Sequence, residues 1–491
     1  MRKHSLLTQT SRFSHKRIFF FIFALSIISG TIAYRLFALA ISRHAEYASA
    51  AQRQQMAPAA ILATRGSIFA FDQSDQSPKL IATNKTTDVL TERYYPKGVF
   101  AAQVLGFVGY REHERVGQYG VESFYDETLR GLETDQRSIG EDIVLTIDPN
   151  IQSYSEVTLD ALLKKWSSPR GSIIVQDPAT GALLAIASSP SFDPNKYGSF
   201  NYADFLNPVV QEQFEPGSSF KPVTMSAAID SDSLTPNTTY EDTGAVTIGS
   251  YTIKNFNEKA NGLQTMRQVL EHSLNTGTIF AERRMGNDNF LNYLVAFGFG
   301  QKTGVDLPGE VAGSINNLYQ GRAINFATAS FGQGIAVTPL QLINAYSAIA
   351  NGGKLMKPYI VREILHADGS STVTKSSFIG APISEKTSAQ IRGMLVDVVD
   401  NGFDKARVKG YDVAGKTGTA QIPDGRGGYL ENKQFIHNFV GFAPAYAPRF
   451  VILIKMDKPQ GITFASDSLS PVFGDLAAYL IRYFNIPPTR Q

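Results

Sequence analysis

The hydrophobic pattern of the chain begins with a long apolar run near its start. Residues 18–34 are uncharged and are mostly Phe, Ile, Leu and Ala, and a second apolar run, 36–41, follows Arg35. A membrane-spanning helix needs about 20 apolar residues, and a long basic side chain near its end can extend to the membrane surface. The pattern therefore predicts a transmembrane anchor over residues 18–41.

The charges that flank this run predict its orientation. Residues 1–17 carry five basic side chains and no acidic one. Because basic segments stay on the cytoplasmic side, we expect 1–17 to be a cytoplasmic tail and the rest of the chain to lie outside. The stretch Ala38-Leu39-Ala40 resembles a signal-peptidase site, so a cleaved secretory signal is the alternative, although the apolar part of such a signal normally has only 7–15 residues. Both interpretations export the remainder.

The exported part begins without a strong pattern. The polar composition of residues 42–64 predicts a linker. In residues 65–146 short apolar runs alternate with turns, and this pattern does not indicate that the segment has a large hydrophobic core of its own. The pattern sharpens from residue 171, where SIIVQD and ALLAIAS flank the turn PATG. Two apolar runs around such a turn predict a buried β-hairpin.

Helical periodicity dominates the middle of the chain, and strands return after it. One helical face before Ser273 consists of Leu263, Met266, Val269 and Leu270, and TPLQLINAYSAIANGG predicts a second amphipathic helix. Three strands are predicted by DVAGKTGTAQI, NFVGFAPA and RFVILIKMD. A last helix, with Phe473, Leu476, Leu480, Tyr483 and Phe484 on one side, stops at Pro487-Pro488. The order predicts an α+β domain with helices packed on a mostly antiparallel sheet.

Composition excludes several function classes. The 491-residue chain has a net charge of +2 and no basic stripe outside its N-terminus, so nucleic-acid binding is not expected. It has no cysteine, which excludes disulfides, thiolate metal sites and a cysteine nucleophile. The seven histidines are scattered without paired spacing. We therefore predict neither a metal site nor a cofactor.

Residues 410–423, GYDVAGKTGTAQIP, satisfy the phosphate-binding pattern G-x-x-x-x-G-K-[ST]. A phosphate-binding loop needs a buried strand before it and a helix that opens at the lysine. The preceding NGFDKARVKG carries four charges in ten residues, and Gly418 and Pro423 would interrupt a helix. The context instead predicts extended chain after Lys416, closed by the turn-rich PDGRGG.

A candidate nucleophile lies in FEPGSSFKPVTMSAAID. Because Pro216-Gly217 marks a turn before an apolar-periodic stretch, Ser218 is predicted in the first turn of a buried helix, with Lys221 on the same face. The helix N-terminus would stabilise an alkoxide, and a neutral lysine could accept the hydroxyl proton. Neutrality requires burial and a second cation nearby, for which Lys416 is the candidate. Taken alone, a helix cap and a solvated lysine explain this pair more simply.

Two further motifs favour the interpretation of Ser218 and Lys221 as a nucleophile and its base. Ser273-Leu274-Asn275 follows 55 residues after Ser218, and Lys416-Thr417-Gly418 follows 143 residues after that. Other matches to the same short patterns occur in less suitable places, before Ser218 or in turn-rich loops: Ser199-Phe200-Asn201, Ser314-Ile315-Asn316 and Lys302-Thr303-Gly304. The set S-x-x-K, S-x-N and K-T-G belongs to penicillin-binding proteins and serine β-lactamases.

With these motifs the chain resembles the class B penicillin-binding proteins, which are peptidoglycan D,D-transpeptidases with one N-terminal membrane anchor. The likeness covers most of residues 90–488 and includes, in the family's order, RYYPKGVFAAQVLGFVG, YGVESFYDETLRG, IVLTIDPNIQ, GSIIVQDPATGALLAIASSPSFDPN, EPGSSFKP, FGFGQKTGVDLPGE, TASFGQGIAVTPLQL and AGKTGTAQ. TGTAQIPDGRGGYLENKQFIHNFVGFAPA and PVFGDLAAYLIRYFNIPP are most similar to the septal, cell-division branch. The resemblance implies a linker and reduced pedestal domain over 42–150 and a transpeptidase domain, of the penicillin-binding and serine β-lactamase type, over 151–491.

The chain departs from the family at the pedestal. The usual start R-G-x-I-x-D-R is present only as Arg65-Gly66-Ser67-Ile68, with Ala70-Phe71 in place of Asp-Arg. Almost nothing stands between Ile81 and Arg93 where relatives carry a sizeable insert. These departures weaken any transfer of the family's division-partner contacts, but not of its chemistry.

The resemblance implies a role for each motif residue. A stem peptide ending in D-Ala-D-Ala would be attacked by Ser218 with Lys221 as base, and an amine of a neighbouring stem would resolve the acyl-enzyme. Ser273 and Asn275 would relay the proton and hold the peptide amide. The terminal carboxylate and the added peptide strand would be bound by Lys416, Thr417, Gly418 and Thr419.

The implied partners are peptidoglycan stem peptides, β-lactam antibiotics, a membrane glycan polymerase and division proteins. The implied location is the bacterial cytoplasmic membrane, with a single pass and the catalytic domain outside. A membrane-bound β-lactamase or penicillin sensor is one alternative, although neither needs residues 42–150. A non-catalytic scaffold for a glycan polymerase is the other, although all three motifs are intact.

Overall fold

The computed structural model describes residues 15–37, 65–86, 91–112, 114–131, 140–256, 258–402, 404–422, 428–429 and 434–490. The helix α1 (His15–Phe37) and the described residues from Arg65 onward belong to two separate compact units. Among the described residues, α1 is the one helix long and apolar enough to cross a membrane. The predicted linker, 42–64, and most of the PDGRGG turn lie outside the described residues.

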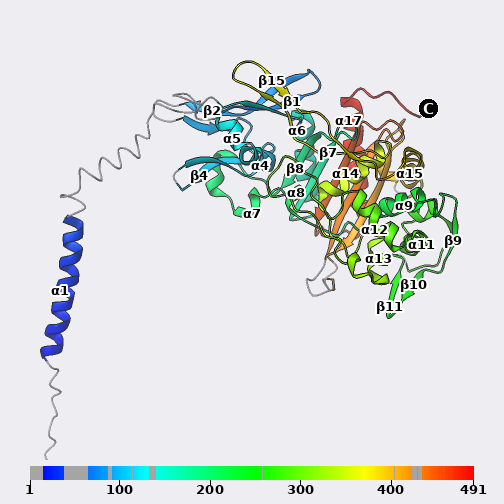
Figure 1. Ribbon diagram of the computed structural model, residues 1–491, viewed down its shortest axis with the longest axis horizontal. Coiled ribbons are helices and arrows are strands. Elements are labelled where there is room, and N and C mark those ends of the chain that lie inside the picture. The colour runs from blue at the N-terminus through cyan, green and yellow to red at the C-terminus, as the bar shows by residue number, and fades with distance from the viewer. Residues whose placement is uncertain are drawn as a thin grey trace, which may run out of the picture. The chain divides into compact units, whose positions relative to one another are not determined.

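A five-stranded antiparallel sheet forms the centre of the large unit (Figure 1). Its order is β17 (Ala414–Gln421), β18 (Phe435–Ala443), β19 (Phe450–Asp457), β7 (Arg170–Gln176) and β8 (Leu183–Ser189). The three predicted C-terminal strands and the predicted hairpin are thus confirmed. Pairing of β19 with β7 joins segments that lie far apart in the sequence.

Both faces of this sheet are buried, which explains why β19, with FVILI, and β8, with LLAIA, carry continuous apolar runs instead of alternating. On β7, Ile174 belongs to one hydrophobic core while Ile173 and Val175 belong to the other. The first core includes the helices α9 (Lys221–Asp230) and α14 (Pro339–Ala350). The second includes α6 (Pro149–Lys165) and α17 (Ser470–Tyr483).

The predicted amphipathic helix in TPLQLINAYSAIANGG and the predicted last helix are confirmed as α14 and α17, and the helix before Ser273 is corrected. Thr338 caps α14 in a reciprocal hydrogen-bonded box with Gln341, as the sequence TPLQ allows. The helix before Ser273, α10, is shorter than predicted and spans Met266–Glu271. Leu263 lies instead on the strand β12 (Gly262–Thr265) and is 66% exposed, because pairing of β12 with β9 (Thr239–Asp242) takes precedence over the helical period.

The N-terminal part of the large unit carries a second sheet of six strands. Its order is β15 (Ser371–Val373), β14 (Val361–Leu365), β6 (Asp142–Leu145), β1 (Ile68–Asp72), β2 (Ser77–Thr86) and β3 (Thr91–Tyr94). Two of these strands, β14 and β15, come from the predicted transpeptidase range. Ile68 and Ile143 share a hydrophobic core with α9 and α14, which agrees with the expectation that 65–146 lack a large core of their own.

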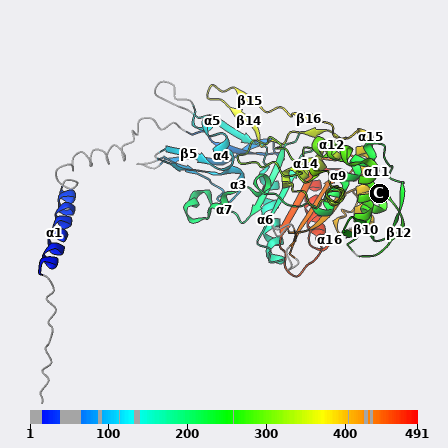
Figure 2. The ribbon, with the colours of Figure 1, turned by 60° about the horizontal axis from the view of Figure 1, so that its bottom comes forward.

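The remaining elements form smaller assemblies. The hairpin β4 (Phe107–Arg111)–β5 (Glu114–Gln118) and the short helices α3 (Ala102–Leu105), α4 (Gly120–Phe124) and α5 (Asp126–Arg130) complete the N-terminal part. At the opposite end of the same unit lie α11 (Asn275–Met285), α12 (Asn287–Ala296), α13 (Ala323–Ala329) and the hairpin β10 (Ala245–Ile248)–β11 (Tyr251–Lys254) (Figures 1 and 2). The unit also contains the helix α15 (Glu385–Asp397) and the short elements α7 (Tyr202–Phe205), α8 (Pro208–Gln211), β13 (Leu355–Met356), β16 (Phe378–Gly380) and α16 (Ala465–Ser468).

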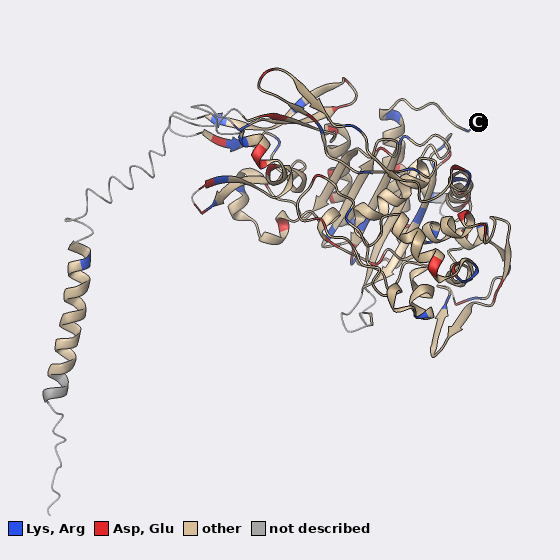
Figure 3. Ribbon diagram, viewed as in Figure 1, with Lys and Arg blue, Asp and Glu red and all other residues tan. Residues whose placement is uncertain are grey.

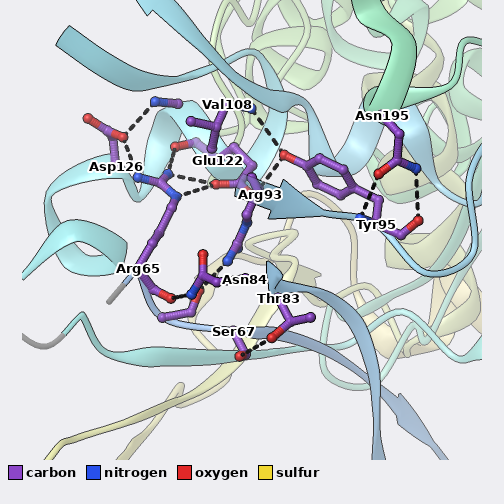
Figure 4. A network of polar contacts seen from close by, with 12 residues as sticks. Arg65, Ser67, Thr83, Asn84, Arg93, Tyr95, Val108, Glu122, Asp126 and Asn195 are labelled. Carbon is purple, nitrogen blue, oxygen red and sulfur yellow. Dashed lines mark hydrogen bonds and ion pairs between the residues drawn. The ribbon is translucent and has the colours of Figure 1, made fainter. Parts of the chain in front are cut away.

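A buried ion-pair network organises the N-terminal part (Figure 4). Glu122 is fully buried and accepts hydrogen bonds from Arg65 Nε and Arg93 Nε, both at 2.7 Å. Tyr95 Oη lies 3.1 Å from the same carboxylate, and Arg65 also pairs with Asp126 at 2.8 Å. One carboxylate thus connects the start of β1, the strand β3 and the helix α4, which are far apart in sequence.

Lys and Arg are interspersed with Asp and Glu over the large unit (Figure 3).

Candidate active site

Ser218 lies in a tight turn packed against β17. The turn is the 3-10 helix η3 (Gly217–Phe220), and the α-helix α9 begins only at Lys221, so the predicted first helical turn is a 3-10 turn. Because side chains three apart in a 3-10 turn eclipse each other, Ser218 and Lys221 share one face. A Cβ atom on Gly418 would lie 2.5 Å from the Pro216 carbonyl oxygen, which shows how closely η3 approaches β17.

Two buried lysines meet at one serine hydroxyl. Lys221 and Lys416 are both 0% exposed. Lys221 Nζ donates to Ser273 Oγ at 3.2 Å and to the Ser273 carbonyl, and Lys416 Nζ donates to Ser273 Oγ at 3.1 Å. With both lone pairs of this hydroxyl engaged, its own hydrogen remains available to a third group.

The electrostatics of this pair favour the neutral amine. Burial, and then the charge of Lys416, lower the pKa of Lys221 well below its ordinary value. Burial lowers the pKa of Lys416 to about 7. Two ammonium groups in one dry pocket repel each other, so the pair binds its protons in sequence and one lysine can serve as a base near neutral pH.

The second motif forms a strained bend before α11. Ser273 has a φ of 56°, in the left-handed region that a residue with a Cβ rarely adopts. This conformation directs both the carbonyl and the hydroxyl of Ser273 to Lys221. Asn275 Nδ2 donates to the Lys254 carbonyl at 2.9 Å, which fixes the orientation of its carboxamide. The neighbouring His272 is exposed.

The third motif lies on an edge strand. β17 pairs with β18 on one side and stands at the end of the five-stranded sheet, so its other side can accept an extended peptide. Thr417 is 6% exposed, and Thr419 Oγ1 accepts from Ala465 N at 3.1 Å. Because Thr419 accepts this bond, its hydroxyl hydrogen is available to an anion.

The structure therefore brings together the three predicted motifs. Lys221, Ser273 and Lys416 are in direct contact, and Ser218 lies on the adjoining turn. The competing Lys302-Thr303-Gly304 lies in a loop, where Thr303 N and Gly304 N donate to Glu310 at 2.7 and 3.0 Å. Among the residues that the structure describes, no group of three or more His, Asp or Glu side chains could hold a metal ion.

Several residues that support this site carry no signal in the sequence. Asn255 and Thr276 are buried beside the second motif, and the ring of Phe256 packs edge-on against Phe464 with centroids 4.7 Å apart. Phe464 directly precedes the residue that donates to Thr419. These residues belong to no short motif, and their separations along the chain carry no periodic signal.

Two family models and several curated proteins match this chain. The family model described as penicillin binding protein transpeptidase domain matches residues 171–478, and that of the penicillin-binding protein dimerisation domain matches 81–139. The chain is similar to stage V sporulation protein D of Bacillus subtilis, with 36% identity over 81% of this chain and 65% of that protein. It is also similar to the peptidoglycan D,D-transpeptidase FtsI homolog of Mesostigma viride, with 30% identity over 81% of this chain and 74% of that protein.

Solved structures show the same fold. Penicillin-binding protein 3 of Mycobacterium tuberculosis in complex with aztreonam is 32% identical and superposes with a TM-score of 0.79, covering 87% of this chain and 97% of that one. The three motifs on this fold define a serine-type, penicillin-binding transpeptidase domain. The chain belongs to the class B penicillin-binding proteins, as its sequence predicts. It spans less than two thirds of the length of the Bacillus relative.

Proposed function

We propose that this chain is a peptidoglycan D,D-transpeptidase in which Ser218 is the nucleophile. The observation that carries the proposal is the contact of two buried lysines with Ser273 Oγ, at 3.2 and 3.1 Å, beside the turn that holds Ser218. A serine hydroxyl is a weak nucleophile unless an adjacent base removes its proton. Burial of Lys221 against a second cation supplies that base.

The reaction would proceed in two steps. Lys221 takes the proton of Ser218 as Oγ bonds to the carbonyl carbon of the penultimate D-alanine. The peptide bond to the terminal D-alanine then breaks, and its nitrogen leaves with a proton relayed through Ser273. An amine from a neighbouring stem attacks the acyl-enzyme carbonyl and passes a proton to Lys221, and Lys221 returns a proton to Ser218 Oγ as the ester bond breaks.

Substrate binding would use β17 and the residues beside it. The donor peptide adds along the free edge of β17, with its terminal carboxylate held by Lys416, Thr417 and Thr419 and the close approach permitted by Gly418. Asn275 holds a peptide amide. Backbone N–H groups of Ser218 and Thr419 would form the oxyanion hole, in which each donor is worth about 3–4 kcal/mol.

The helix α1 suits an enzyme whose substrate lies outside the membrane. We propose a single pass in the bacterial cytoplasmic membrane, with the basic tail inside, and a division of the chain at residues 17, 41 and 150. The donor and acceptor are peptidoglycan stem peptides, and β-lactams acylate the same serine. The septal role, and partnership with a membrane glycan polymerase and division proteins, rest on the resemblance of the sequence.

The test is the mass of the full chain in detergent after incubation with benzylpenicillin. We expect an adduct of one drug molecule on the wild type and none on Ser218→Ala. An equal adduct on both proteins would remove Ser218 as nucleophile, and the absence of any adduct would remove the function. Rapid loss of the adduct would identify a β-lactamase instead, because a transpeptidase passes its acyl group to an amine and hydrolyses it slowly.

A further inference from the structure

A buried carboxylate outside the three motifs lies at the centre of a hydrogen-bond network behind Asn275. Asp242, at the end of β9, is 1% exposed. Its Oδ1 accepts from Gly244 N at 3.1 Å, Asn255 Nδ2 at 2.9 Å and Thr276 Oγ1 at 2.7 Å. Its Oδ2 accepts from Asn255 Nδ2 at 2.9 Å, Asn261 N at 3.0 Å and Asn261 Nδ2.

The network reaches Asn275 by two routes. Asn255 Oδ1 accepts from the backbone N–H of Thr276 at 3.2 Å, and Thr276 directly follows Asn275 at the start of α11. Asn255 also directly follows Lys254, whose carbonyl accepts from Asn275 Nδ2 at 2.9 Å. The backbone N–H of Asn255 is held by the Gly244 carbonyl at 2.9 Å. Asp242 thus fixes both the helix start that carries Asn275 and the carbonyl that orients its side chain.

We propose that Asp242 is a positioning residue that sets the orientation of the Asn275 carboxamide toward the acyl donor. The proposal rests on the proposed function and adds to it the residue that decides how a donor amide is recognised. Because the Lys254 carbonyl can only accept, the side-chain atom that faces it must be Nδ2. Asn275 Oδ1 and its second N–H are then directed elsewhere, as a fixed acceptor and donor for a peptide amide.

Substitution of the carboxylate would disturb this orientation specifically. All the contacts of Asp242 are donors, so an amide at this position would place an N–H group against another donor whichever way it turned. A buried donor without an acceptor is unfavourable, and the end of β11 that carries Lys254 can relieve this by moving away. The expected loss concerns recognition of the amide, since Asp242 accepts its hydrogen bonds from Gly244, Asn255, Asn261 and Thr276, which lead to Asn275.

The experiment compares two β-lactams that differ in one amide. Benzylpenicillin carries an acylamino side chain, and 6-aminopenicillanic acid lacks it. Second-order acylation rates of the full chain in detergent are measured for the wild type, Asp242→Asn and Asn275→Ala. We expect Asp242→Asn to slow acylation by benzylpenicillin about 10-fold or more, and to slow 6-aminopenicillanic acid much less. In the Asn275→Ala background, Asp242→Asn should not change the ratio of the two rates further.

Two variants separate positioning from folding. Asp148 is also fully buried and accepts four hydrogen bonds, from Gln73 N, Asn150 N, Ile151 N and Tyr483 Oη, none of which belongs to the site motifs. Asp148→Asn should lower the melting temperature and leave the ratio of rates unchanged. If Asp242→Asn does not fold, Thr276→Val removes one donor to Asp242 at nearly constant shape and should lower the ratio in the same direction.

The outcomes are distinct. Equal slowing of both β-lactams by Asp242→Asn, or an effect that persists in the Asn275→Ala background, would overturn the positioning role. That role would also be overturned if the Asp148→Asn control changed the ratio as much. A wild type that neither compound acylates would instead overturn the proposed function, and the inference with it.

Discussion

The close approach of η3 to β17 makes Gly418→Ala a sharp test of the site geometry. An added Cβ would lie 2.5 Å from the Pro216 carbonyl oxygen, 2.6 Å from Asn438 Nδ2 and 2.7 Å from Asn438 Oδ1. Asn438 cannot easily turn away, because its Nδ2 already donates to the Pro216 carbonyl at 3.0 Å. Carbon contacts of this kind normally need about 3.5 Å, so η3 and β17 must separate by roughly 0.5–1 Å.

The expected loss in acylation rate depends on how far this separation displaces Ser218. Pro216 stands two residues before Ser218, so the nucleophile moves with it relative to the carboxylate-binding strand. A displacement of about 1 Å in a positioned reactant costs on the order of 10²-fold in rate. The same overpacking should destabilise the fold by about 1–3 kcal/mol.

The assay is the second-order rate of acylation by benzylpenicillin, together with the melting temperature. Gly393→Ala on α15 is the matched control, because a Cβ there has no heavy atom within 4 Å. This control should acylate at the wild-type rate and gain about 0.5–1 kcal/mol of stability from helix propensity. Wild-type acylation by Gly418→Ala would refute the idea that the absence of a side chain permits the approach of Ser218.

Two further predictions concern charges. With the pKa of Lys221 well below its ordinary value and that of Lys416 at about 7, the active enzyme holds one proton on the pair, and the acylation rate should be bell-shaped with pH. It should rise as Lys221 loses its proton and fall as Lys416 loses its own; a rate that climbs steadily to pH 9 would contradict this. Glu122→Gln should destabilise the protein by about 3–5 kcal/mol in thermal unfolding, because it leaves Arg65 and Arg93 buried without their shared anion. The amount of penicillin adduct per folded molecule should be the same in Glu122→Gln as in the wild type. If the melting temperature of Glu122→Gln equals that of the wild type, the ion-pair network around Glu122 does not stabilise the fold.

The local elements of this protein follow from short-range sequence patterns. The apolar run of α1, the amphipathic α14 and the strands β17 to β19 have periods of a few residues, so each is determined within its own segment. The three candidate motifs are also local strings. The resemblance to the family depended on these motifs together with the longer segments that occur in the family's order over residues 90–488.

The sequence patterns were less informative wherever partners lie far apart on the chain. Leu263 fits a helical face in the sequence but lies on β12, because the pairing of β12 with β9 determines the local conformation more strongly than the helical period does. The pairing of β14 with β6 gives the N-terminal sheet strands from the transpeptidase range, a register that no local pattern encodes. Both cases depend on which surfaces the folded chain brings into contact.

The sequence by itself determined the class of chemistry, since serine, lysine and the K-T-G strand were present in the required spacing. Only the tertiary structure decided how the side chains that would carry out this chemistry are arranged in space. It buries Lys221 and Lys416 against one hydroxyl from a third segment, places β17 at the end of its sheet and surrounds Asp242 with donors. The physical reason is that burial, and hence the pKa of an amine or the direction of an amide, is a property of neighbours in space and not of neighbours in sequence.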